Sequence, residues 1–67
     1  MHVGKAIQFF QNQQELSGIE LAGRINITPQ QLSRWRGSED MTVSSVVRVA
    51  EGLGVSVDKL IEKALSL

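Results

Sequence analysis

Four segments of this chain share one pattern that begins an α-helix. In each segment a Ser or Thr is preceded by an apolar residue and followed by a second apolar residue four positions later. The hydroxyl accepts a hydrogen bond from a free backbone N–H of the first turn, and the two apolar side chains pack together as a hydrophobic staple. The four predicted N-caps are Ser17, Thr28, Thr42 and Ser56. Because no strand-like alternation of apolar and polar residues accompanies them, we predict an all-α protein.

The first two caps carry further helix-start signals. Glu20 completes a capping box with Ser17, and Gln31 completes one with Thr28. Pro29 occupies the first helical position after its cap, where a missing N–H does no harm. These signals predict helices that begin directly after residues 17 and 28.

A further helix precedes the four caps. It is predicted over about residues 3–14 from the helical spacing of Val3, Ala6, Ile7 and Phe10. Gly54 suits the left-handed position that ends the fourth helix. The sequence therefore predicts five helices joined by short turns.

Length and composition limit what such a chain can do. We expect a single domain over residues 1–67, and a chain this short buries only about 60% of its unfolded surface. Cys is absent and His2 is the only His, so we predict no disulfide, no metal site and no cofactor. No apolar run approaches the ~20 residues of a membrane span and no signal peptide is visible, so we expect a cytoplasmic protein.

The net charge is zero, but the charges are unevenly distributed. Residues 21–38 hold Arg24, Arg34 and Arg36 and no acid, a balance of +3, whereas residues 1–20 and 39–67 carry −1 and −2. Arginine is suited to bidentate contact with phosphate or guanine. The segment is therefore a candidate for binding nucleic acid.

The same segment has the layout of a helix-turn-helix. The first two caps are eleven residues apart, which leaves a helix from Gly18 to Ile25 before a turn at Asn26-Ile27. Asn adopts the left-handed conformation of such turns more readily than other non-glycine residues. We therefore predict a helix-turn-helix at about residues 17–36. Its buried side is predicted to hold six apolar residues: Ile19, Leu21, Ile25, Ile27, Leu32 and Trp35.

Three stretches of the sequence match the sequence pattern of a known family: Leu21-Ala22, the run from Thr28 to Trp35, and the run from Ala50 to Leu60. Together they make the stretch from Leu16 to Ile61 resemble the phage repressor and Cro family of helix-turn-helix domains, the lambda repressor-like domains. The resemblance implies a five-helix domain whose third helix enters the major groove, usually as a homodimer on a near-palindromic DNA operator. It also implies a Cro-like or repressor-like transcriptional regulator, acting at the nucleoid of a bacterial or phage-infected cell.

The chain departs from the family pattern in several places. Asn26 stands where the family usually has Gly, and Arg36 follows Trp35 where an acidic residue is typical. The family's ion pair between that acid and the first helix is therefore absent, with Gln11 near the expected partner position. The loop after the third helix is one residue shorter and reads Ser38-Glu39-Asp40, whereas the family loop is often basic. The acidic pair argues against phosphate contacts from this loop.

The third helix presents a polar face. With Leu32 and Trp35 buried, the outward residues are Pro29, Gln30, Ser33, Arg34 and Gly37. Gln pairs bidentately with adenine and Arg with guanine, each worth ~1–3 kcal/mol of discrimination. Gln31 lies at the margin of this face, and both the capping box and a base contact are open to it. We expect base contacts from Pro29, Gln30, Gln31, Ser33 and Arg34, and phosphate contacts from Ser17, Gly18, Arg24, Thr28, Arg36 and Ser38.

The aromatic residues and His2 are interpreted structurally. Trp35 lies on the apolar stripe of its helix, which favours the core over base stacking. Phe9 and Phe10 are interpreted as core or interface residues, and His2 is given no role. No catalytic motif or phosphate-binding loop is present, so we predict neither an enzyme nor a small-molecule substrate.

Two questions stay open at the level of sequence. One is whether the fold reads DNA or serves as a protein-interaction module, antirepressor-like or antitoxin-like, which the zero net charge and the acidic loop support. The other is the interface of the expected homodimer, which must set two third helices about 34–36 Å apart. The loop from Gly37 to Met41 is one candidate surface. The C-terminal helix is favoured, because it holds more apolar residues than one stripe needs: Val57, Leu60, Ile61, Ala64, Leu65 and Leu67.

Overall fold

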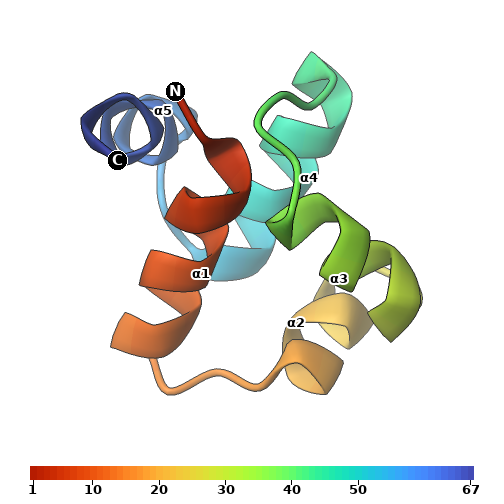
Figure 1. Ribbon diagram of the computed structural model, residues 1–67. Helices are drawn as coiled ribbons and strands as arrows, with labels where there is room; N and C mark the ends of the chain where they lie inside the picture. The colour runs from red at the N-terminus through yellow and green to blue at the C-terminus, as the bar shows by residue number, and fades with distance from the viewer.

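The computed structural model describes residues 1–67 and contains five helices and no strand (Figure 1). The all-α, five-helix prediction is therefore confirmed. The helices are α1 (Val3–Gln13), α2 (Gly18–Arg24), α3 (Pro29–Arg36), α4 (Val43–Leu53) and α5 (Val57–Ser66). None of them combines the length and the apolar character that a membrane span requires.

All four predicted N-caps are confirmed. The side chains of Ser17, Thr28, Thr42 and Ser56 each accept a hydrogen bond from the backbone N–H three residues later. The two helix ends predicted to need a left-handed residue also have one, at Asn26 (φ 58°) and Gly54 (φ 69°). Hydrogen bonds that span three or four residues depend only on the local chain, which is why these boundaries are readable from sequence.

His2 has a role that its sequence context did not reveal. Its Nδ1 accepts a hydrogen bond from the backbone N–H of Lys5 at 3.0 Å, so His2 is the N-cap of α1. Its own backbone N–H donates to the carbonyl of Ala64 in α5 at 3.0 Å. The interpretation of His2 as a residue without a role was wrong, because the imidazole stands in for the usual Ser or Asp cap.

Helix α1 runs through the middle of the molecule, with α5 on one side and α3 on the other (Figure 1). It approaches α3 so closely that a Cβ added to Gly4 would lie 2.7 Å from the carbonyl oxygen of Trp35 and closer still to that of Arg36. The first free N–H groups of α1 donate to the loop after α3: Val3 to the carbonyl of Glu39 at 3.0 Å and Gly4 to that of Ser38 at 2.9 Å. This loop therefore caps α1.

The core is made of fifteen buried hydrophobic residues drawn from all five helices, the link before α2 and the turn after it. The predicted burial of Leu21, Ile25 and Leu32 is confirmed, and Trp35 and Ile27 are half-buried against this core. The predicted burial of Ile19 is wrong, because the residue is 75% exposed. It lies two residues before Leu21, about 200° around the helix, and so faces away from the core.

Helix α1 separates its two neighbouring aromatic rings. Phe10 enters the core, while Phe9 is 37% exposed and meets Phe10 edge-on, with the ring centroids 5.2 Å apart. The ammonium group of Lys63 lies 4.1 Å from the centre of the Phe9 ring, a cation–π contact between α1 and α5. Phe9 therefore lies at the surface beside α5, and Phe10 lies in the core.

Candidate nucleic-acid interface

Helix α3 lies at the edge of the molecule, packed on α1 and α2 (Figure 1). Leu32 seals its inner side with no exposed surface, and Trp35 is half-buried beside it. Every residue predicted for the outward face is exposed: Pro29, Gln30, Ser33, Arg34 and Gly37. The helix thus presents amide, hydroxyl and guanidinium groups to solvent from one rigid surface.

Gln31 is half-buried at the margin of this face. Its backbone N–H donates to Thr28 Oγ1 at 3.1 Å, but its side chain does not return a bond to Thr28. The predicted capping box is therefore complete only at Ser17, where the Glu20 carboxylate accepts from the backbone N–H of Ser17 at 3.3 Å. A neutral amide oxygen is a weaker acceptor than a carboxylate, which favours the return bond from Glu20 and not from Gln31.

Arg36 ends α3 with its side chain turned toward α1 and α2. Its Nη1 donates to Gln11 Oε1 at 3.1 Å, and the guanidinium lies beside Gly18 at the beginning of α2. The family resemblance implied that the ion pair between the first helix and the residue after Trp35 is absent from this chain. The hydrogen bond between Gln11 and Arg36 joins those two positions instead. Ser17, Gly18 and Arg36, all predicted phosphate contacts, are thus brought together at one corner of the molecule.

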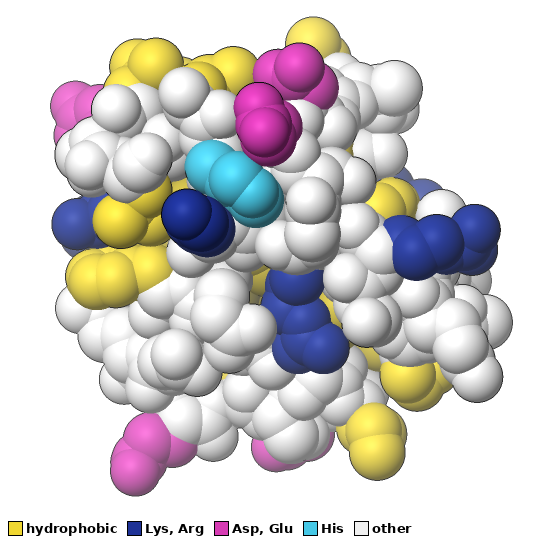
Figure 2. All heavy atoms as spheres, viewed as in Figure 1, with side chains coloured by type: hydrophobic (Ala, Val, Ile, Leu, Met, Phe, Trp, Pro, Cys, Tyr) yellow, Lys and Arg dark blue, Asp and Glu magenta, His cyan; other side chains and the backbone are white.

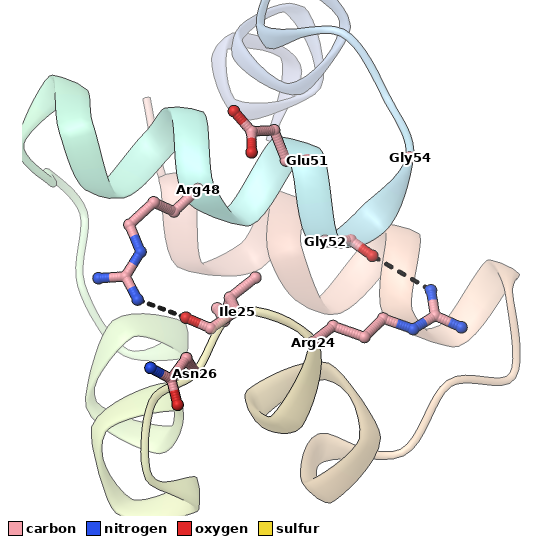
Figure 3. A pocket seen from close by; sticks show the side chains of 7 residues that line it. All are labelled: Arg24, Ile25, Asn26, Arg48, Glu51, Gly52 and Gly54. Carbon is pink, nitrogen blue, oxygen red and sulfur yellow. Dashed lines mark hydrogen bonds between the residues drawn. The ribbon is translucent and has the colours of Figure 1, made fainter.

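Arg24 lies elsewhere, at the end of α2 next to α4. Its Nη1 donates to the carbonyl of Gly52 at 3.1 Å, while Arg48 in α4 donates to the carbonyl of Ile25. Figure 3 shows these two bonds joining the ends of α2 and α4 around an open cavity of about 500 Å³. Arg24 satisfies a last-turn carbonyl of α4, and Arg48 satisfies the carbonyl of the C-cap residue of α2. Arg24 therefore does not share the corner formed by Ser17, Gly18 and Arg36, and the role of Arg48 had no local signal in the sequence.

The remaining predicted phosphate contacts are Thr28 and Ser38. Thr28 is exposed, and its hydroxyl oxygen is engaged by the N–H of Gln31. The Ser38 hydroxyl donates to the carbonyl of Arg34 at 3.0 Å, so its proton caps the end of α3. Glu39 and Asp40 follow, both exposed.

On the side of the molecule drawn in Figure 2, the charged side chains do not form one basic patch. In the view of Figure 2 the Lys and Arg side chains are dispersed, and the acidic ones lie near the upper and lower edges. Since the net charge of the chain is zero, any binding of DNA has to depend on a few placed arginines and on hydrogen-bonding groups of α3 more than on a broad positive field.

No protein-family model matches the chain, and no curated protein matches it by sequence. Solved structures do match. Two crystal structures of the clp gene regulator ClgR from Corynebacterium glutamicum superpose with TM-scores of 0.87 and 0.85 at 26% identity, covering 96% of this chain and 84% and 69% of theirs. The wild-type restriction-modification controller protein C.Esp1396I has a TM-score of 0.76 at 24% identity, covering 97% of this chain and 91% of its own. The chain is therefore similar in fold to two regulatory proteins.

Proposed function

We propose that this chain is a helix-turn-helix transcriptional regulator that binds operator DNA with α3 in the major groove. The observation that carries the proposal is the polar face of α3, where Gln30, Ser33 and Arg34 are exposed on a helix fixed from behind by Leu32 and Trp35. A helix presented in this way enters the major groove, where each base pair offers a distinct set of donors and acceptors. The likeness to ClgR, a gene regulator, supports the same function.

The side chains on α3 divide between two kinds of contact. Arg34 supplies the paired donors that match guanine, and Gln30 supplies the donor and acceptor that match adenine. Gln31 joins them, because its side-chain amide is not held by Thr28. Pro29 and Ser33 complete the proposed base-contacting set, while Ser17, Gly18, Thr28 and Arg36 flank it as phosphate contacts. Arg24 and Ser38 become weaker candidates, since both are engaged with backbone carbonyls.

We further propose that the protein is of the phage repressor and Cro type and reads a near-palindromic operator as a homodimer through α5. Leu65 and Leu67 are 65% and 50% exposed, and Met1, which precedes the residue bonded to the Ala64 carbonyl, is 54% exposed. Figure 1 places α5 on the side of the molecule opposite α3. Two α3 helices about 34 Å apart would each lie about 17 Å from the twofold axis, a distance smaller than the 26 Å over which the Cα atoms extend in the longest direction.

The competing candidate is a protein-interaction module that does not read DNA. It is favoured by the exposed Glu39 and Asp40 at the end of α3 and by the zero net charge. Selecting bound sequences from a pool of random DNA duplexes, and then measuring affinity at several salt concentrations, separates the two. We expect an inverted repeat with half-sites about 10 base pairs apart and a steep fall of affinity with salt. Failure to enrich any sequence, with no salt-dependent binding, would favour the interaction module.

A further inference from the structure

Gln11 is the one polar side chain in the buried set, at 4% exposure. A buried amide is unfavourable unless its groups are hydrogen-bonded, so a residue of this kind needs a partner. The Oε1 atom of Gln11 accepts a hydrogen bond from Nη1 of Arg36, which reaches it from the end of α3. The side chain of Gln11 therefore fixes the position of one guanidinium.

That guanidinium lies at the first residue of α2. A Cβ built on Gly18 would be 3.1 Å from Arg36 Nη1, 3.6 Å from Nη2 and 3.7 Å from Gln11 Nε2. Three nitrogen atoms from α1 and α3 thus meet under one small residue of α2. Of the three, Nη1 donates to Gln11, while Nη2 and Nε2 donate to no protein group. No buried side-chain nitrogen or oxygen lacks a partner, so these two reach the surface.

The charge of this cluster is not compensated by its partner. Gln11 is neutral, whereas a carboxylate at the same position would form an ion pair with Arg36. The cluster therefore combines a full positive charge with unused N–H donors, and the half-burial of Arg36 restricts the motion of its side chain. A pre-ordered guanidinium with free donors is suited to an anion with paired oxygens, such as a phosphodiester.

The position of the cluster relative to α3 indicates which anion. The major groove is about 12 Å wide, and an α-helix with its side chains is about 10–12 Å across. A helix in the groove is therefore bordered by phosphates, and α2 packs along one side of α3. The beginning of α2 and the end of α3 meet at this border.

We propose that Gln11 is a positioning residue that holds the guanidinium of Arg36 for a phosphate of the DNA backbone, with its own Nε2 as a second donor. This proposal rests on the proposed function, because it needs DNA in contact with α3. It assigns to α1, which does not enter the groove, a part in DNA affinity. It does not assign Gln11 any part in choosing between base sequences.

The decisive variant is Gln11→Glu, which keeps the size and the acceptor of the side chain but neutralises Arg36. We expect affinity to fall at least about tenfold on both operator and random DNA, as for loss of one charged hydrogen bond. The slope of log affinity against log salt should become shallower by about 0.9 for each protomer on the DNA. Gln13→Glu is the matched control, since it makes the same change on α1, where Gln13 is exposed and lines the groove with α5.

A purely structural role would leave the salt slope unchanged. If Gln11→Glu melts early in circular dichroism, Arg36→Gln decides the matter, because it removes the charge without placing a carboxylate in the interior. The inference would be overturned if Arg36→Gln bound DNA with the same affinity and the same salt slope as wild type. It would also be overturned if Gln11→Glu and Gln13→Glu lost the same amount of DNA affinity. In both cases DNA binding itself would stand. Absence of salt-dependent binding by the wild-type protein would overturn both the inference and the proposed function.

Discussion

Gly4→Ala tests the close approach of α1 to α3. The added Cβ would lie 2.7 Å from the carbonyl oxygen of Trp35 and closer to that of Arg36, and both neighbours are backbone atoms that cannot rotate away. Ordinary contacts are about 3.5 Å, so the two helices must separate by on the order of 1 Å. That movement also stretches the hydrogen bonds from Val3 to Glu39 and from Gly4 to Ser38, at 3.0 and 2.9 Å.

The magnitude follows from these contacts. Overpacking typically destabilises by about 1–3 kcal/mol, and each weakened backbone hydrogen bond adds roughly 0.5–1.5 kcal/mol. The higher helix propensity of Ala offsets up to about 1 kcal/mol. We therefore expect the free energy of unfolding to fall by about 2–4 kcal/mol, out of roughly 3–10 kcal/mol for a chain of this length. The melting temperature should fall by at least about 10 °C.

Gly23→Ala is the control. Gly23 is exposed in α2 and a Cβ there would meet no atom within 4 Å, so we expect stability to rise by up to about 1 kcal/mol. Urea titration and thermal melting, both followed by far-ultraviolet circular dichroism, measure the stability of the two variants side by side. A Gly4→Ala protein as stable as wild type would refute the helix contact.

The other predictions concern the core, the proposed dimer and the outward face of α3. Trp35→Ala should lower the free energy of unfolding by about 2–4 kcal/mol, less than for a fully buried indole, and a stable variant that only lost DNA affinity would reassign Trp35 to base stacking. Leu65→Gln with Leu67→Gln should abolish dimers in sedimentation while leaving the melting of the monomer nearly unchanged, since both side chains are exposed; persistent dimers would place the interface elsewhere. A truncation after Lys63 would be less informative, because it removes the fully buried Ala64. Gln30→Ala should weaken operator binding by ~1–3 kcal/mol with a much smaller effect on random DNA, and equal losses on both would make Gln30 a phosphate contact.

The features predictable from sequence are those that depend on neighbouring residues. The caps at Ser17, Thr28, Thr42 and Ser56 need only the following turn of chain, and the outward face of α3 follows from the spacing of Leu32 and Trp35. The beginnings of α2, α3, α4 and α5 and the outward face of α3 could therefore be predicted.

The features that escaped prediction depend on residues distant in sequence. Arg36 bonds Gln11 across 25 positions and Arg24 bonds Gly52 across 28, so neither partner is visible before the helices are packed. Arg24 and Arg36 looked equivalent in a basic segment, yet packing directs one to α4 and the other to the beginning of α2. The burial of Ile19 was predicted wrongly for a related reason. An apolar residue in a short helix does not by itself define which side of the helix is buried.

The central claim is that α3 reads bases, and Arg34 allows the most direct test. On the selected operator, each guanine in a half-site is replaced in turn by 7-deazaguanine, which lacks the N7 acceptor, and the affinities of wild type and Arg34→Ala are measured on every duplex. We predict one guanine per half-site at which the base change weakens wild type but not Arg34→Ala, with a coupling energy of roughly 1–3 kcal/mol. If Arg34→Ala instead lost the same affinity on every duplex, random DNA included, α3 would not be reading guanine through this residue, and the account of recognition would be contradicted.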